Sequence, residues 1–229
     1  ADASVFVNKL LSEKKSGSVS GSMDLLWING ENFKNAKENG LLWGPVSEKL
    51  PNYQNYINPA TVQSDFGFPV EGFEIPYGRA QFVFEYDSAK VSDIPDSYEK
   101  LKEWVKKNPG KFTYPQPPDF TASAFIRQVF YAVTGGDIQY AGEFNKTVFD
   151  KNKSLWLKYM TDISPYLWNG GKNYPKDIAA LDTLFERGEI LINMSYHQAD
   201  AQNRIITGRY PSTVKTFVMK EGSIYNTHF

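Results

Sequence analysis

The stretch PKDIAALDTLFERGEILINMSYHQADAQNRII, residues 175–206, decides the fold class of this chain. A proline stands at the start of the predicted helix 176–187 and a glycine follows its end, which is the usual asymmetry of a helix. Residues 189–194 are almost continuously apolar, as in a strand buried on both faces. Residues 199–206 predict a second helix. Helix, buried strand and helix in succession predict a sheet that is covered by helices.

The same alternation extends outward through the chain. The pattern predicts strands at 23–28, 81–86 and 216–219, and helices at 5–15, 96–107, 121–134 and 154–162. Residues 31–70 are polar and rich in Asn, Gly and Pro, so we expect irregular structure with one short helix there. This alternation is typical of the α/β class with a largely parallel sheet. Such sheets bind ligands beyond the carboxyl ends of their strands, which directs attention to residues 27–33 and 195–198.

The composition excludes several classes of function. The 229 residues include 25 basic and 26 acidic side chains, so no global charge indicates nucleic acid as a partner. Cysteine is absent, which excludes disulfides, thiolate catalysis and cysteine-ligated zinc. No apolar run approaches the roughly 20 residues that span a bilayer.

Six motifs resemble those of one family. They are DLLWINGENF at 24–33, PYGRAQFVFEYD at 76–87, NPGKFTYPQPPDFTASAF at 108–125, LWNGGKNYP at 167–175, GEILINMS at 188–195 and GSIYNTHF at 222–229. In this order, and over nearly the whole chain, they resemble the extracellular solute-binding proteins of ABC importers, in the thiamine-type branch. The chain departs from the family pattern at Tyr77 and Ala122, where Trp and Gly are expected.

The resemblance implies a periplasmic-binding-protein fold of type II, with two lobes, mixed and mostly parallel sheets, and an incomplete first lobe. Residues 1–79 would form part of lobe 1, residues 84–209 lobe 2, and residues 214–229 a return to lobe 1. The implied function is to capture a small solute between the lobes and to deliver it to permease subunits in the membrane. The solute would be thiamine-like or a sugar, because abundant aromatic rings suit stacking and cation–π contacts. The implied location is periplasmic or extracellular, with membrane association through the transporter or through a lipid anchor outside this chain. No cofactor and no nucleic acid is implied.

Three segments supply most of the candidate ligand-binding residues, and each has a structural alternative; Tyr77, Tyr225 and Asn226 come from two further motifs of the family. In the first segment, Gly30 allows close backbone approach and two asparagines offer donors and acceptors, although the segment could be a turn with Trp27 in the core. In the second, the start of a helix offers free N–H groups to a ligand, unless Asp119 or Thr121 caps that helix. In the third, Tyr196 could stack on a ligand or close the edge of the core. The full set of candidates is Trp27, Asn29, Gly30, Asn32, Phe33, Tyr77, Asp119, Thr121, Ala122, Ser195, Tyr196, Tyr225 and Asn226.

The sequence predicts neither catalytic residues nor a metal site. The carboxylates Asp65, Glu71, Glu74 and Asp119 show no spacing that singles out a catalytic pair. The two histidines, His197 and His228, match no metal or catalytic motif. We therefore expect a binding protein and not an enzyme. Two alternatives stay open: a secreted carbohydrate-acting enzyme or carbohydrate-binding module, and an interaction domain without a small ligand.

Overall fold

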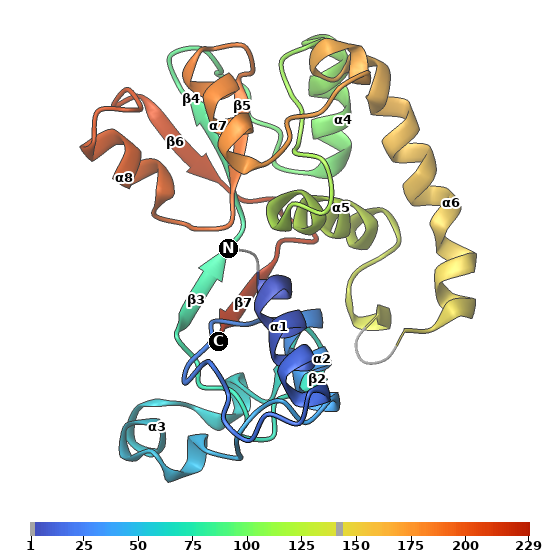
Figure 1. Ribbon diagram of the computed structural model, residues 1–229. Coiled ribbons are helices and arrows are strands. Elements are labelled where there is room, and N and C mark those ends of the chain that lie inside the picture. The colour runs from blue at the N-terminus through green and yellow to red at the C-terminus, as the bar shows by residue number, and fades with distance from the viewer. Residues whose placement is uncertain (1–2, 141–143) are drawn as a thin grey trace. The chain divides into compact units, whose positions relative to one another are not determined.

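The computed structural model describes residues 3–140 and 144–229 (Figure 1). These residues divide into two units. Unit 1 consists of residues 3–79 and 226–229, and unit 2 consists of residues 80–140 and 144–225. The chain passes from unit 1 to unit 2 between Arg79 and Ala80, and it returns between Tyr225 and Asn226.

Unit 1 is mainly helical. Its elements are α1 (Ala3–Lys15), α2 (Glu31–Glu38), α3 (Pro51–Tyr56), two short 3-10 helices (Ser47–Lys49 and Pro59–Thr61) and the strand pair β1 (Ser64–Asp65) and β2 (Phe68–Pro69). Its core gathers Val7, Ile28, Phe33, Ala36, Val62, Val70 and Phe229. Phe33 and Ala36 lie three residues apart on α2, so one face of this helix is buried.

The strand predicted at residues 23–28 does not form. These residues have no regular secondary structure; Leu25 is 88% exposed and only Ile28 is buried. A short apolar run becomes a strand only when a neighbouring strand supplies backbone hydrogen-bond partners, and among the described residues no strand pairs with this run. The apolar pattern therefore predicted the burial of Ile28 correctly, but its prediction of a strand was wrong.

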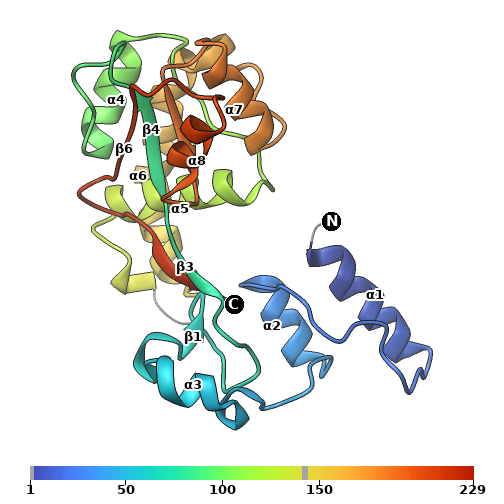
Figure 2. The ribbon, with the colours of Figure 1, turned by 90° about the vertical axis from the view of Figure 1, so that its left-hand side faces the viewer.

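Unit 2 holds the larger core. Its elements are β4 (Val83–Asp87), α4 (Tyr98–Lys107), α5 (Phe120–Val133), α6 (Lys146–Ile163), α7 (Ile178–Glu186), β5 (Ile192–Ser195), α8 (Asp200–Ile206), β6 (Val214–Phe217) and three 3-10 helices (Ile138–Tyr140, Ser164–Tyr166 and Trp168–Gly171). Figure 2 shows β4 running through this unit next to α7 and α8. The mixed α/β class that the sequence predicts is confirmed.

The central sheet of unit 2 has the strand order β5-β4-β6 and is covered on both faces. On one face the ring of Phe84 packs 6.2 Å from that of Phe125 on α5. The next residue of β4, Glu85, points to the other face, where it meets Asn193 of β5 and the hydroxyl of Tyr210. The two faces of the sheet therefore differ in kind: one is aromatic and the other carries polar groups in its interior.

Two details of the expected topology need correction. We expected largely parallel pairing, but β4 pairs antiparallel with both β5 and β6, and the only parallel contact in the described part of the chain is the bridge between Phe112 and Ile192. Long connections separate these strands, and a residue pattern does not encode their direction. We also expected the return to lobe 1 to start at residue 214. Strand β6 instead completes the sheet of unit 2, and only residues 226–229 join unit 1.

Two further strands pair with each other where the chain passes between the units. They are β3 (Gly78–Gln81) and β7 (Tyr225–His228). The backbone N–H of Tyr77 donates to the carbonyl of His228 at 2.7 Å, and that of Phe82 donates to Ile224 at 2.9 Å. The boundary between the units therefore lies inside a pair of hydrogen-bonded strands.

Candidate functional site

Two exposed aromatic rings lie side by side in unit 1. The ring centroids of Trp27 and Tyr77 are 4.7 Å apart and their planes are inclined by 49°. Trp27 is 58% exposed and Tyr77 is 76% exposed. Large aromatic side chains are usually buried, so a paired and exposed indole and phenol form a surface on which a flat or apolar group can stack. The alternative that Trp27 belongs to the core is therefore wrong.

Two hydrogen bonds anchor the segment behind this aromatic pair. The N–H of Gly30 donates to Oδ2 of Asp65, and Oδ1 of Asn29 accepts from the N–H of Phe229 at 3.1 Å. Gly30 has φ +58° and stands directly before α2, where a Cβ would lie 3.4 Å from the ring of Phe66. The asparagine and the glycine thus fix the loop by contacts within unit 1.

The next two candidates lie on α2. Asn32 is half-buried. Phe33 is fully buried, and its ring centroid lies 5.9 Å from that of Phe68. A solute cannot reach Phe33, so its prediction as a ligand-binding residue is corrected. It was chosen because it follows the loop, but it is the first residue on the buried face of the helix.

A pair of acidic side chains lies buried in unit 1, and their spacing in the sequence did not single them out as a pair. Asp65 Oδ1 and both carboxyl oxygens of Glu74 are buried without a hydrogen-bond partner among the described residues. Burial raises the pKa of Asp65 to about 6. Burial, and then the negative charge of Asp65, raise the pKa of Glu74 to about 9, although Lys37 opposes the shift. Near neutral pH, Glu74 is therefore an uncharged acid.

In unit 2, Asp119 caps α5 and also contacts the start of α7, which Asp177 caps. Its Oδ1 accepts from the N–H of Ala122 at 2.9 Å in the first turn of α5, and its Oδ2 accepts from the N–H of Ile178 at 3.0 Å at the start of α7. Thr121 and Ala122 are both buried. Of the two roles weighed for this segment, capping by Asp119 is observed, and it occupies the Ala122 N–H that was considered for a ligand.

The carboxyl end of β5 carries the second group of candidates. Ser195 is buried, and its Oγ accepts from the N–H of His197 at 3.2 Å. Tyr196 is buried in the core of unit 2, in agreement with the alternative that it closes the edge of the core. Its ring lies 4.8 Å from that of Phe120, which is 48% exposed at the first residue of α5. The side chain of Gln198 accepts from the N–H of Gln81 at 3.1 Å. This end of unit 2 therefore combines aromatic edges with polar groups.

Sequence reasoning missed Phe120 and Gln198. Phe120 directly precedes the candidate Thr121, and Gln198 lies in the 195–198 loop that the strand pattern singled out. The last two candidates, Tyr225 and Asn226, lie in β7, where Tyr225 is exposed and Asn226 half-buried.

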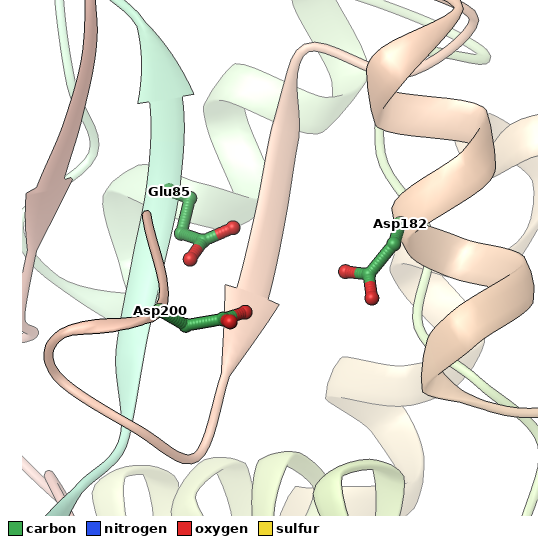
Figure 3. Close-up of side chains that lie close together, drawn as sticks. All are labelled: Glu85, Asp182 and Asp200. Carbon is green, nitrogen blue, oxygen red and sulfur yellow. The ribbon is translucent and has the colours of Figure 1, made fainter. Parts of the chain in front are cut away.

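A second acidic cluster lies inside unit 2. Figure 3 shows the carboxyl groups of Glu85, Asp182 and Asp200 directed toward one another, and one oxygen of each lies within 4.8 Å of the others. The guanidinium of Arg204 donates to Asp182 at 2.6 Å and to Asp200 at 2.9 Å. Because an arginine already occupies two of the three carboxylates, the cluster is a charge network and poorly suited to a metal ion. A lone acid in the apolar run FVFEY, residues 82–86, was the signal that could have revealed it.

The family is decided by a match that extends over almost the whole chain. The sequence profile of the bacterial extracellular solute-binding proteins matches residues 2–227. The chain belongs to this family. Protein YnjB of Escherichia coli strain K12 is 35% identical over 230 residues, which is 100% of this chain and 59% of YnjB. The chain therefore spans less than two thirds of the length of this relative.

Solved structures support the same fold at low sequence identity. The spermidine/putrescine ABC transporter substrate-binding protein PotD of Streptococcus pneumoniae gives a TM-score of 0.66 at 12% identity, over 99% of this chain and 60% of that one. A periplasmic thiamin binding protein gives a TM-score of 0.53 at 16% identity, over 99% and 60%. In the described part of this chain, no helix combines the length and the apolar character needed to cross a membrane.

Proposed function

We propose that this chain forms part of the substrate-binding component of an ABC importer, which captures a small solute between two lobes and delivers it to membrane permease subunits. The observation that carries the proposal is the family match over residues 2–227. The paired strands β3 and β7 suit a hinge, because the chain passes between the units inside both of them. The solute shifts the equilibrium toward the closed state by binding that state more tightly.

We further propose that the role is binding without chemical conversion of the solute. The family and the similar structures are transport proteins, and nothing in the comparisons favours the carbohydrate-acting enzyme considered as an alternative. The description of the family as extracellular supports a periplasmic or extracellular location. Attachment to the membrane would come from the transporter or from a lipid anchor.

For the solute, we infer a small molecule with a flat or ring-shaped group. Unit 1 presents Trp27 and Tyr77, and unit 2 presents Phe120, whose ring packs against the buried ring of Tyr196. Such rings stack on planar heterocycles and on the apolar faces of sugars, and they attract cations. A thiamine-like molecule meets all three descriptions, a sugar meets one, and a linear polyamine offers charge without a ring. The presence of a thiamin binding protein among the similar structures supports thiamine as a candidate.

Thermal unfolding with added solutes tests the proposal. Thiamine, a neutral hexose and spermidine would each be titrated into the full-length protein. A ligand at a hundred times its Kd stabilises the folded state by about 2.7 kcal/mol, so a true solute raises Tm by several degrees. We expect thiamine to give the largest increase. A response to the hexose alone would revise the solute class, and a protein that responds to no small molecule would contradict the proposed function.

A further inference from the structure

Glu85 is the only member of the unit 2 acidic cluster without a cationic partner. Arg204 pairs with Asp182 and Asp200, and it also lies 3.5 Å from Glu186. The contacts to Glu85 come instead from neutral donors: Asn193 Nδ2 at 2.9 Å and the Tyr210 hydroxyl at 3.1 Å, both to Oε2. The guanidinium thus balances the negative charges of Asp182 and Asp200 but not a charge on Glu85.

The surroundings of the second carboxyl oxygen of Glu85, Oε1, indicate how the charge of this group is neutralised. The side chain is fully buried, and Oε1 has no hydrogen-bond partner among the described residues. A buried carboxylate oxygen without a donor is costly, whereas a protonated carboxyl group carries no charge to desolvate. A metal ion at this position would stand beside the guanidinium of Arg204. A proton is therefore the occupant that fits the cluster.

The groups that face Glu85 agree with this assignment. Burial and the negative charges of Asp200 and Asp182 raise the pKa of Glu85 to about 7, against the bonds from Asn193 and Tyr210. The charged and titratable groups of the surrounding network come from α7, from α8 and from the segment after α8: Asp182, Glu186, Asp200, Arg204, Arg209 and Tyr210. The two neighbouring strands contribute neutral residues, Asn193 on β5 and Thr216 on β6.

The cluster also joins the two ends of the turn 195–200, which carries the candidate residues Ser195 and Tyr196. Asn193 and Ser195 lie on β5 before the turn, and Asp200 and Arg204 lie on α8 after it. Glu85 holds Asn193 directly, while Asp182 holds both Asn193 and Arg204. Ionisation of Glu85 would add a third negative charge to this cluster, which would repel Asp200 and oppose the order of the turn.

We propose that Glu85 is a proton-binding residue that positions the turn 195–200: as a neutral acid it keeps the turn ordered, and its loss of the proton favours opening of the turn. In the ordered state Glu85 holds its proton to a higher pH than in an opened state that water reaches. Opening therefore becomes easier as pH rises from about 4.5 to 7, by up to about tenfold per pH unit, and levels off above that range. The proposal concerns unit 2 alone and needs no bound solute, so it stands apart from the proposed function.

Hydrogen exchange of the backbone across residues 195–203, corrected for intrinsic pH effects, tests this in the whole protein. Wild type should lose at least about tenfold in protection between pH 5 and 7. The variant Glu85→Gln, which resembles the neutral acid, should lose this dependence. Glu103→Gln is the matched control, because Glu103 is an exposed residue of α4 outside the cluster, and it should behave as wild type. Equal pH dependence in wild type and Glu85→Gln would overturn the proposal.

A second measurement keeps the proposal open to refutation if Glu85→Gln does not fold. Carboxyl ¹³C NMR of wild type labelled at glutamate follows protonation directly. We expect a buried glutamate that titrates near pH 7 and whose signal is absent in Glu85→Asp. If every glutamate of unit 2 titrated at pH 5 or below, Glu85 would be ionised at neutral pH and the proposal would be wrong.

Discussion

At Trp27, a large apolar ring faces solvent in unit 1 beside the ring of Tyr77. Because the indole is 58% exposed, its removal costs the fold little. If the ring stacks on the solute, Trp27→Ala should weaken affinity by about tenfold while Tm stays nearly constant. Calorimetric titration measures the affinity.

The control for this substitution is Trp43→Ala. Trp43 is also an exposed tryptophan of unit 1, with Lys49 over its ring at 5.4 Å, and it is not a candidate for binding. It should leave the affinity unchanged. Equal losses of affinity in both variants would mean that Trp27 has no specific part in the site.

Asp119 caps α5 through Oδ1, and its Oδ2 accepts from the first N–H of α7, whose own cap is Asp177. Removal of Asp119 therefore uncaps one helix and breaks one further hydrogen bond. The lost cap costs about 1 kcal/mol and the lost hydrogen bond about another 1 kcal/mol, so Asp119→Ala should lower the free energy of unfolding by about 2 kcal/mol. Asp119→Asn keeps one acceptor and should lose about half as much. Urea unfolding measures both, and a loss in Asp119→Asn as large as in Asp119→Ala would contradict the assignment of one stabilising contact to each carboxyl oxygen.

Glu74 makes the stability of unit 1 depend on pH. Its pKa is about 9 in the folded chain and near 4.3 when unfolded, so the unfolded state releases the proton first. The contribution of Glu74 to the free energy of unfolding therefore declines as pH rises from about 4.5 to 9. Glu74→Gln should be more stable than wild type at pH 8, by at least about 2 kcal/mol, and close to it at pH 5. Unfolding by urea at both values measures the difference, with exposed Glu48→Gln as the control; an advantage that does not grow with pH would refute the assignment.

The candidate residues show what sequence can and cannot reveal at this scale. The pattern before α5 pointed to Asp119 because a cap is a local feature, which is fixed by residues a few positions apart. The prediction for Phe33 was wrong because its distance from a turn can be read from the sequence, whereas the face of α2 that is buried cannot. Asp65, Glu74 and Glu85 were beyond reach, because their raised pKa values arise from burial by residues distant in sequence.

At the scale of elements, the prediction of a strand was most reliable where the sequence also predicts a helix on each side of it. Strand β5 starts inside the predicted run 189–194 and ends one residue after it, and α7 and α8 flank it as expected. Residues 23–28 carry an equally apolar run but find no partner strand among the described residues. Apolar character predicts burial, whereas strand formation also needs hydrogen-bond partners that the sequence does not specify.

The connection between α6 and α7 depends on one glycine more than on its neighbour. Gly170 and Gly171 both have positive φ, at +63° and +68°. A Cβ at Gly171 would lie 2.2 Å from the carbonyl oxygen of Ser164, whereas nothing lies within 4 Å of one at Gly170. Gly170→Ala should cost only the strain of the left-handed backbone, about 1–2 kcal/mol, and Gly171→Ala clearly more. Urea midpoints compare them, and equal losses would show that the connection can shift to relieve the contact.

At the scale of the molecule, the two units and the family match place this chain among the bacterial extracellular solute-binding proteins. The α/β class followed from the alternation of segments, but the family came from motifs, because composition and periodicity are shared by many folds. Antiparallel pairing of β4 with β5 and β6 was unpredictable for the same reason: strand direction depends on how long connections cross the unit.

The central claim is that the intact protein holds a small solute. Native mass spectrometry of the full-length protein, purified gently from its source, tests it most directly, with the Trp27→Ala variant prepared in parallel. We expect a fraction of the protein to carry one additional small-molecule mass that disappears on denaturation and is less abundant in the variant. Protein that shows only its own mass in both preparations, even after incubation with thiamine, hexose and spermidine, would contradict the claim.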